Sequence, residues 1–200
     1  MKKLTIFLLC GLAIARSAQT PPKTFTSADG AFRFYYPELL VNCLQSPSSG
    51  SCMSQGTLCD GPGSEGTTLA CFAYPNERFK DKPSFETALF YVSEIRPATT
   101  EKVCLMGSPN WLVTNSQAGT TTINHVTFKA FEIGDNWMNA GQDGPVYRTF
   151  HHGKCYELGI QTFTSRYPYD PGTVEEFTKQ DWTEVESRLR VALDSFVFLK

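Results

Sequence analysis

The chain has 200 residues, with 18 Lys and Arg against 20 Asp and Glu and three histidines, so its formal net charge is −2 at pH 7. Binding to a nucleic acid backbone needs clustered Lys and Arg that displace counterions, and the basic residues here are scattered along the chain. We therefore expect no nucleic acid partner. The length suits one domain that buries roughly two-thirds of its unfolded surface.

The N-terminal residues have the pattern of a secretion signal. Two lysines follow Met1, residues 4–15 carry no charge, and small residues follow, so that cleavage after Ala15, Ser17 or Ala18 would each leave small side chains near the cut. The apolar run of about 12 residues is shorter than the roughly 20 that a membrane-spanning helix needs. We expect residues 1–17 to be a signal peptide, residues 18–200 to form a single domain, and the mature chain to have no stable membrane insertion.

Removal of residues 1–17 would take away Lys2, Lys3 and Arg16, leaving 15 basic residues against 20 acidic ones and a net charge of −5. Six cysteines would remain, an even number that is typical of an oxidising compartment. They are Cys43, Cys52, Cys59, Cys71, Cys104 and Cys155. Because none of them forms a C-x-x-C pair, we expect disulfides in a secreted or periplasmic protein, with no metal and no cofactor.

The disulfide pairing is open at the level of sequence, since six cysteines permit 15 pairings. We predict Cys52–Cys59, Cys43–Cys71 and Cys104–Cys155. Residues 46–68 are mainly Ser, Gly, Pro and Thr, so they are expected to form a long surface loop that these bridges hold in place.

Alternating and β-branched segments predict strands. Residues 32–36 alternate and end at Pro37, and residues 69–74 end at Pro75. Further strands are predicted over 111–114, 121–133, 146–150 and 155–163, with residues 151–154 as the turn of the last hairpin. The short connectors favour antiparallel pairing.

Two helices are predicted from apolar spacing. Ser84 can cap a helix over 85–95, in which Phe85, Ala88, Leu89 and Val92 would share one face. Thr178 or Asp181 can open a second helix, with Trp182, Val185, Leu189 and Ala192 or Leu193 on one side, and residues 195–199 then add a closing strand. The order of elements predicts an α+β fold, an antiparallel β-sheet flanked by helices, with a long disulfide-tied surface loop.

Three segments of the chain resemble the PsbP-like family, an α/β/α sandwich named for a thylakoid-lumen subunit of photosystem II. They are Gly30-Ala-Phe-Arg-Phe-Tyr-Tyr-Pro37, Cys155-Tyr-Glu-Leu158 and the closing helix followed by Ser195-Phe-Val-Phe198. The resemblance is one of fold. It implies an extrinsic binding or assembly protein more often than an enzyme, and it assigns no site residue.

Aromatic residues in two predicted loops are the candidate binding residues. Residues 135–144 place Trp137 and Met138 between amide and glycine residues, where an exposed apolar pair could anchor a partner, although Trp137 could equally fold back over the sheet edge. Tyr167 and Tyr169 lie in a second aromatic loop, which could also be a rigid turn.

Signals for catalysis are sparse. His151 and His152 are weak metal candidates, because successive strand residues point to opposite faces and a solvated turn explains them as well. No nucleophile elbow, HExxH helix or Walker loop is present in the sequence. We expect no catalytic residue and an exported non-enzymatic domain that binds a protein partner or small ligand. The alternative is a secreted hydrolase or metal-dependent enzyme with a site assembled from scattered residues such as His151, Glu157 and Asp170.

Overall fold

The computed structural model describes residues 20–47, 49–53, 59, 66–107, 119–137, 140–165 and 175–199. The expected signal peptide lies outside these residues, so its removal and the domain boundary after residue 17 stay predictions. In the part of the chain that is described, no helix is long and apolar enough to cross a membrane.

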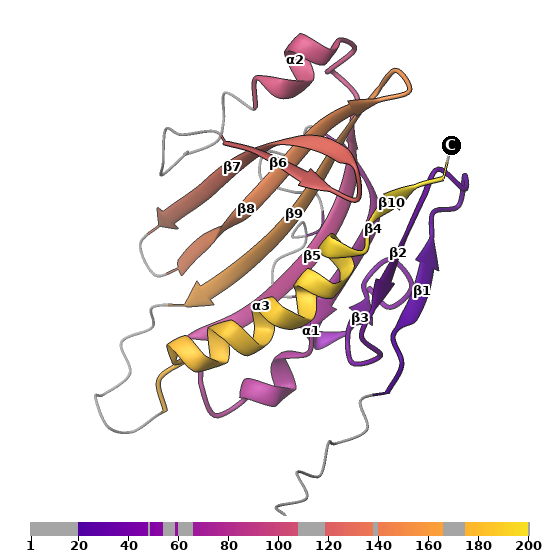
Figure 1. The fold of residues 1–200 in the computed structure, drawn as a ribbon. Helices are drawn as coiled ribbons and strands as arrows, with labels where there is room; N and C mark the ends of the chain where they lie inside the picture. Colours follow the sequence, from indigo (N-terminus) through magenta and orange to yellow (C-terminus); the bar gives the residue numbers. More distant parts are fainter. Residues whose placement is uncertain are drawn as a thin grey trace, which may run out of the picture.

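Two antiparallel sheets form the framework of the molecule (Figure 1). The larger sheet has seven strands in the order β3-β4-β5-β9-β8-β7-β6. These strands are β3 (Val41–Asn42), β4 (Gly66–Tyr74), β5 (Phe85–Ile95), β6 (Gly119–Ile123), β7 (Val126–Trp137), β8 (Ala140–His151) and β9 (Lys154–Ser165). The smaller sheet has the order β1-β2-β10, with β1 (Lys23–Thr26), β2 (Phe32–Tyr36) and β10 (Val197–Phe198).

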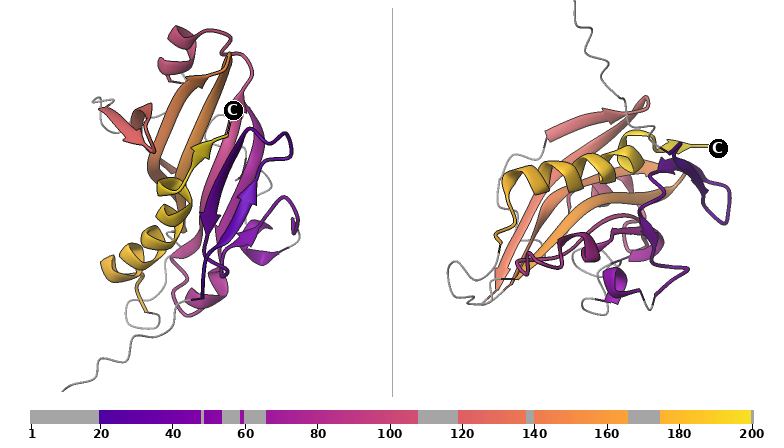
Figure 2. Two further views of the ribbon diagram at one scale, coloured as in Figure 1. Left: turned by 45° about the vertical axis from the view of Figure 1, so that its right-hand side comes forward. Right: turned by 90° about the horizontal axis from the view of Figure 1, so that it is seen from below.

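Helices lie on both faces of the larger sheet. The long helix α3 (Lys179–Asp194) crosses one face, and the short α1 (Gly50–Met53) lies on the other side, as the view from below in Figure 2 shows. The 3₁₀ helix η2 (Asn76–Phe79) follows β4, and α2 (Glu101–Leu105) packs near one end of β8 and β9. The predicted fold class, an α+β antiparallel sheet flanked by helices with a disulfide-tied loop region, is confirmed.

The face that α3 covers, which we call the helix face, carries the main hydrophobic core. Phe34 of β2 lies with its ring centroid 5.4 Å from Phe72 and 5.1 Å from Phe90, both edge-on. All three rings are fully buried, as are Val185 and Leu189 of α3. Large aromatic rings in edge-to-face contact dominate the burial of apolar surface. The smaller sheet and α3 therefore cover the helix face together.

The opposite face, which we call the outer face, carries a buried polar network. Tyr91 donates its hydroxyl to Oε1 of Glu157 at 2.8 Å, and Arg148 donates Nε–H to Oε2 of the same carboxylate at 2.7 Å. All three residues are at most 2% exposed. Burial, followed by the nearby Glu157 charge, raises the pKa of Tyr91 well above its ordinary value. Satisfied hydrogen bonds make this buried ion pair tolerable, and loss of either charged partner would leave the other one buried alone.

The prediction of a helix over 85–95 is wrong, because these residues form the strand β5. Nearly every residue of β5 is buried, with Ala88, Phe90 and Val92 on the helix face and Leu89 and Tyr91 on the outer face. A strand that is covered on both faces has a continuous apolar run, in which a helical spacing of apolar residues occurs automatically.

Two further segments differ from their predictions. Residues 121–133 do not form one strand but most of the β6–β7 hairpin, whose turn places Asn124 and His125 at φ 44° and 70°. The predicted loop at 135–144 consists of the ends of β7 and β8, which pair from Gly134↔Asp143 to Trp137↔Ala140. Short polar side chains such as Asn tolerate the left-handed conformation that a tight hairpin turn requires.

The remaining predicted elements that fall within the described residues are found. Strands over 32–36, 69–74, 146–150 and 155–163 all fall within observed strands, and the turn at 151–154 is confirmed, with Gly153 at φ 78°. The strand predicted over 111–114 lies outside the described residues.

Three disulfides are formed, and only one of them has the predicted pairing. Cys104–Cys155 ties α2 to β9 as predicted. The other two bridges are Cys43–Cys52 and Cys59–Cys71, so the predictions Cys52–Cys59 and Cys43–Cys71 are wrong. The first of these two bridges joins α1 to Cys43, directly after β3, and the second joins Cys59 to β4. The predicted Cys52–Cys59 bridge would instead have joined the loop region only to itself.

Both ends of α3 are held by side chains. Thr178 is the N-cap, as one of the two predicted alternatives stated, and it forms a reciprocal capping box with Asp181, whose carboxylate also contacts Lys82 Nζ at 2.6 Å. Hydrogen bonds from Lys82 and Thr178 lower the pKa of Asp181. At the other end, Asn124 in the β6–β7 turn donates Nδ2–H to the carbonyl oxygen of Asp194 at 2.7 Å. Such caps satisfy backbone groups that a helix leaves unpaired.

We expect Gly159→Ala to destabilise the protein by about 1–3 kcal/mol, the usual cost of overpacking a core. A Cβ at position 159 would collide with the Tyr91 ring on the outer face. Urea unfolding monitored by circular dichroism measures the change. Gly119→Ala is the matched control, because nothing lies within 4 Å of a Cβ there, and it should shift stability by less than about 0.5 kcal/mol. Equal effects of the two substitutions would contradict the tight packing of Tyr91.

Candidate functional site

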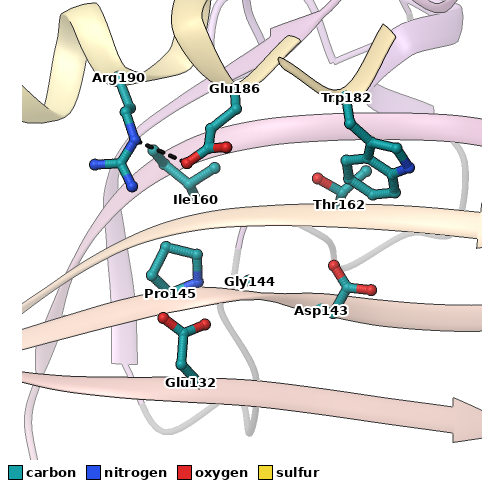
Figure 3. A pocket seen from close by; sticks show the side chains of 9 residues that line it. All are labelled: Glu132, Asp143, Gly144, Pro145, Ile160, Thr162, Trp182, Glu186 and Arg190. Carbon is teal, nitrogen blue, oxygen red and sulfur yellow. Dashed lines mark hydrogen bonds and ion pairs between the residues drawn. The ribbon is translucent and has the colours of Figure 1, made fainter. Parts of the chain in front are cut away.

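A pocket of about 250 Å³ lies between α3 and the helix face of the sheet (Figure 3). From α3, it is lined by Trp182, Glu186 and Arg190, which are spaced four residues apart and so share one stripe of the helix. A neighbouring stripe that includes Val185 and Leu189 faces the core. The pocket therefore lies where the apolar contact between α3 and the sheet ends.

The floor of the pocket comes from three neighbouring strands. Glu132 of β7 pairs with Pro145 of β8, and Asp143 of β8 lies between Gly134 of β7 and Thr162 of β9. Residues that are directly opposite each other in an antiparallel sheet share a face, and the next residue but one along a strand shares it too. The two carboxylates consequently project on the same side, toward α3.

The β8–β9 ladder is interrupted under the pocket. Pairing passes from Asp143↔Thr162 to Val146↔Gly159 without a partner for Gly144 or Pro145. Pro145 has no N–H to donate to the ladder. Gly144 has φ 143°, and a Cβ at this residue would collide with the carbonyl oxygen of Ile160. The register of the two strands is the same on both sides of this gap, so the sheet continues beyond it.

The pocket carries more negative than positive charge. Arg190 Nε contacts Glu186 Oε1 at 2.8 Å, so this pair is close to neutral. Glu132 and Asp143 have no ion-pair partner within 4.0 Å among the described residues. In the described structure, the pocket thus holds two carboxylates, from β7 and β8, that have no cation at ion-pair distance.

The pKa values of both carboxyl groups reflect their partial enclosure. Burial raises the pKa of Glu132; the Arg190 charge opposes this rise, and the Glu186 and Asp143 charges add to it. Burial also raises the pKa of Asp143. Each side chain still has an exposed side, so solvent reaches the carboxylates while the pocket wall removes part of their hydration.

An aromatic wall closes one end of the pocket. The Trp182 ring meets Phe177 edge-on, with 5.2 Å between the centroids, and Phe177 in turn stacks on the buried Phe85. In Figure 3 the Trp182 indole lies beside Thr162 and near the Asp143 carboxylate. An aromatic face beside carboxylates attracts a positively charged group.

Among the described lining residues there is no cysteine, serine or histidine that could act as a nucleophile or as a base near neutral pH.

The side chains of the four predicted binding residues are not described by the structure. Trp137 is the last residue of β7, and its side chain lies outside the described part of the structure, as do Met138, Tyr167 and Tyr169 in full. Their roles stay predictions. The segment predicted as a binding loop nevertheless supplies Asp143, in a strand rather than in a loop.

The weak metal candidates lie away from the pocket. His151 ends β8 and stacks on Phe198 with 3.9 Å between ring centroids, and the His152 ring meets it edge-on at 4.2 Å. The turn thus brings the two imidazoles together, helped by the positive φ of His152. A group of three potential metal ligands is found in the described residues at Cys43, Cys59 and Cys71, all of which are in disulfides.

Four charged residues of the pocket were not predicted as site residues from the sequence: Glu132, Asp143, Glu186 and Arg190. Glu186 is exposed and forms the rim of the pocket. One usable signal was the adjacent Gly144-Pro145 pair, since proline within a strand marks an edge or an irregularity. Another was the spacing of Trp182, Glu186 and Arg190 beside the apolar stripe.

Solved structures, but no family model and no curated protein, resemble this chain. Among solved structures, the chain is similar to the Ran-binding protein Mog1p of Saccharomyces cerevisiae, with 10% sequence identity, a TM-score of 0.40, and coverage of 90% of this chain and 96% of that chain. The site described above rests on this chain's own geometry.

We expect the carboxyl groups of Glu132 and Asp143 to titrate above their ordinary pKa values. A raised pKa means that the folded state holds the proton more tightly, so these groups stabilise the fold at low pH and lose that contribution as pH rises from the ordinary value through the raised one. Carboxyl ¹³C NMR titration measures both values. Arg190→Gln should raise the pKa of Glu132 further and leave Asp143 nearly unchanged, whereas Arg190→Lys retains the charge and serves as the control. Ordinary pKa values for both groups would contradict their partial desolvation.

Proposed function

We propose that this chain is an exported, non-enzymatic domain that binds a positively charged group in the pocket under α3. The group belongs either to a small ligand or to a side chain of a protein partner. Ammonium and guanidinium groups are the cations with the chemistry that carboxylates and an indole ring recognise.

The observation that carries this proposal is the charge balance of the pocket. Arg190 is engaged by Glu186, and Glu132 and Asp143 remain without a cationic partner within ion-pair distance in the described structure. Holding two partly desolvated carboxylates near each other is unfavourable unless a cation can approach them. A positively charged ligand would offset this cost, while an anion would add to it.

The size and walls of the pocket restrict the ligand. A volume of about 250 Å³ is slightly below the usual range for a drug-sized molecule, so the pocket suits one small cation or one side chain. Pro145 and Ile160 supply apolar surface, and Trp182 supplies a ring face. These walls fit the carbon stem of an amine rather than a bare metal ion, which would need more oxygen ligands at fixed distances.

Export is supported by the cysteines. Three disulfides are formed, which is compatible with an extracellular or periplasmic protein, and cytosolic thiols are normally kept reduced. The predicted signal peptide at residues 1–17 supports the same proposal from the sequence.

The alternative, an enzyme with a site assembled from His151, Glu157 and Asp170, is less well supported. His151 stacks on Phe198 at the side of the smaller sheet, while Glu157 is buried on the outer face in contact with Arg148 and Tyr91. The two side chains point to opposite sides of the larger sheet and cannot share a substrate. Asp170 lies outside the described residues.

Three probes of similar shape and different charge test the proposal. Benzylamine should bind and shift the indole N–H signal of Trp182 in ¹H–¹⁵N NMR spectra, whereas benzyl alcohol should bind more weakly and benzoate should not bind. Glu132→Gln and Asp143→Asn should each raise the Kd for benzylamine about tenfold, the loss expected for one charge-assisted hydrogen bond.

Glu176→Gln is the control for these variants, because Glu176 is an exposed carboxylate that does not line the pocket. Its Kd should equal that of the unsubstituted protein. Benzoate binding as tight as that of benzylamine would contradict the charge argument, and no Trp182 shift with any probe would contradict the site.

A separate prediction concerns export. The protein recovered from the exported fraction should have a mass that begins after Ala15, Ser17 or Ala18 and should contain six oxidised cysteines in three bridges. Intact-mass spectrometry before and after reduction and alkylation measures both properties. A native product that retains the apolar leader, or that is alkylated at all six positions without reduction, would show that the proposal of export is wrong.

A further inference from the structure

Two of the disulfides lie directly beside each other on the outer face. The Sγ atoms of Cys43, Cys59 and Cys71 all lie within 4.8 Å of one another, although Cys43 is bonded to Cys52 and Cys59 is bonded to Cys71. A small side-chain rotation would therefore bring a sulfur of one bridge into contact with a sulfur of the other.

The four sulfurs differ in their access to solvent. Cys43 is 4% exposed and Cys71 is 0% exposed, while Cys52 and Cys59 are partly exposed. A thiol in solution can thus reach Cys52 or Cys59, and the two buried cysteines face each other behind them. Access and the identity of the attacked sulfur decide the course of thiol–disulfide exchange.

We propose that these four cysteines form an exchange site for an external thiol, which interconverts the observed bridges with a second pair, Cys43–Cys71 and Cys52–Cys59. The class of reactant is a low-molecular-weight thiol such as glutathione or the thiol of an oxidoreductase.

The exchange balances without a net oxidant or reductant. The external thiolate attacks Sγ of Cys59, forms a mixed disulfide there and releases the Cys71 thiolate. That thiolate attacks Sγ of Cys43, which lies within 4.8 Å, and so forms the Cys43–Cys71 bond and releases the Cys52 thiolate. The Cys52 thiolate then attacks Cys59 and regenerates the external thiolate.

The backbone is already arranged for the Cys43–Cys71 bond. Strands β3 and β4 pair at Asn42↔Phe72, so Cys43, the next residue after β3, comes opposite Cys71. The backbone N–H of Cys43 donates to the Cys71 carbonyl oxygen at 2.9 Å. Directly opposite residues in an antiparallel pair have Cα atoms about 4.5–5.5 Å apart, within the range that a disulfide spans. This bridge needs side-chain rotation rather than backbone movement.

Exchange would change what the loop region is attached to. The Cys59–Cys71 bridge attaches residue 59 to β4, and this attachment would be lost. Helix α1 would stay in place without Cys52, because Ser51 accepts a hydrogen bond from Thr87 through its carbonyl oxygen at 2.9 Å and contacts Asn76 through its hydroxyl. The new pair would therefore remove the covalent link between Cys59 and the sheet and leave the hydrogen bond from Thr68 Oγ1 to the Cys59 carbonyl oxygen, at 2.6 Å, as its described contact with β4.

The double variant Cys52→Ser/Cys59→Ser tests the proposal. We expect Cys43 and Cys71 to form a bridge in this variant. When the unreduced protein is treated with iodoacetamide and its peptides are mapped by mass spectrometry, neither of these two cysteines should be alkylated. Alkylation of both thiols in a variant with a native circular dichroism spectrum would overturn the proposal.

Exchange in the unsubstituted protein gives an independent measurement, which also decides the matter if the variant fails to fold. The oxidised protein is incubated with reduced glutathione, quenched with acid, and its linked peptides are mapped. A Cys43–Cys71 peptide should appear while Cys104–Cys155 persists, because that bridge has no third sulfur in the described cluster. Persistence of the original bridges alone, or equal scrambling of Cys104 and Cys155, would overturn it.

Discussion

The larger sheet must be covered on both faces, and the rest of the structure depends on this constraint. Its central strands β5 and β9 are buried almost throughout, so α3 and the smaller sheet have to cover one side while α1, α2 and the disulfide-bonded segments cover the other. The helix face meets this demand with stacked aromatic rings. The outer face also buries Arg148 and Glu157, which are stable there because Tyr91 and the ion pair satisfy the carboxylate.

The pocket exists because α3 covers only part of the helix face of the larger sheet. A single helix is narrower than a sheet of seven strands, so α3 packs closely over β5 and β9 and leaves a gap toward β7. Core residues fill the first region, and Glu132, Asp143 and the Gly144-Pro145 interruption occupy the second. If the pocket binds a cation as proposed, one stripe of α3 contributes to stability and the neighbouring stripe to binding.

The sequence was informative wherever a signal was local. The alternation in residues 32–36 and the Thr178 cap predicted a strand and a helix start, and the order of such elements predicted the fold class. The helix expected over 85–95 failed because two-sided burial removes the alternation that distinguishes a strand. The pocket could not be predicted, since Glu132 and Asp143 become neighbours only through the register of β7 and β8. Disulfide pairing depends on the same long-range geometry, and the predicted bridges missed two of three.

The caps of α3 have a consequence for ligand entry. The Lys82–Asp181 contact and the Thr178 capping box fix its first turn, and Asn124 fixes its last turn from a hairpin some 70 residues away in sequence. Because α3 is held at both ends, it cannot move outward as a flap, so a ligand would have to enter through the open side of the pocket. The proposed binding site is preorganised, and binding would cost little conformational entropy of the chain.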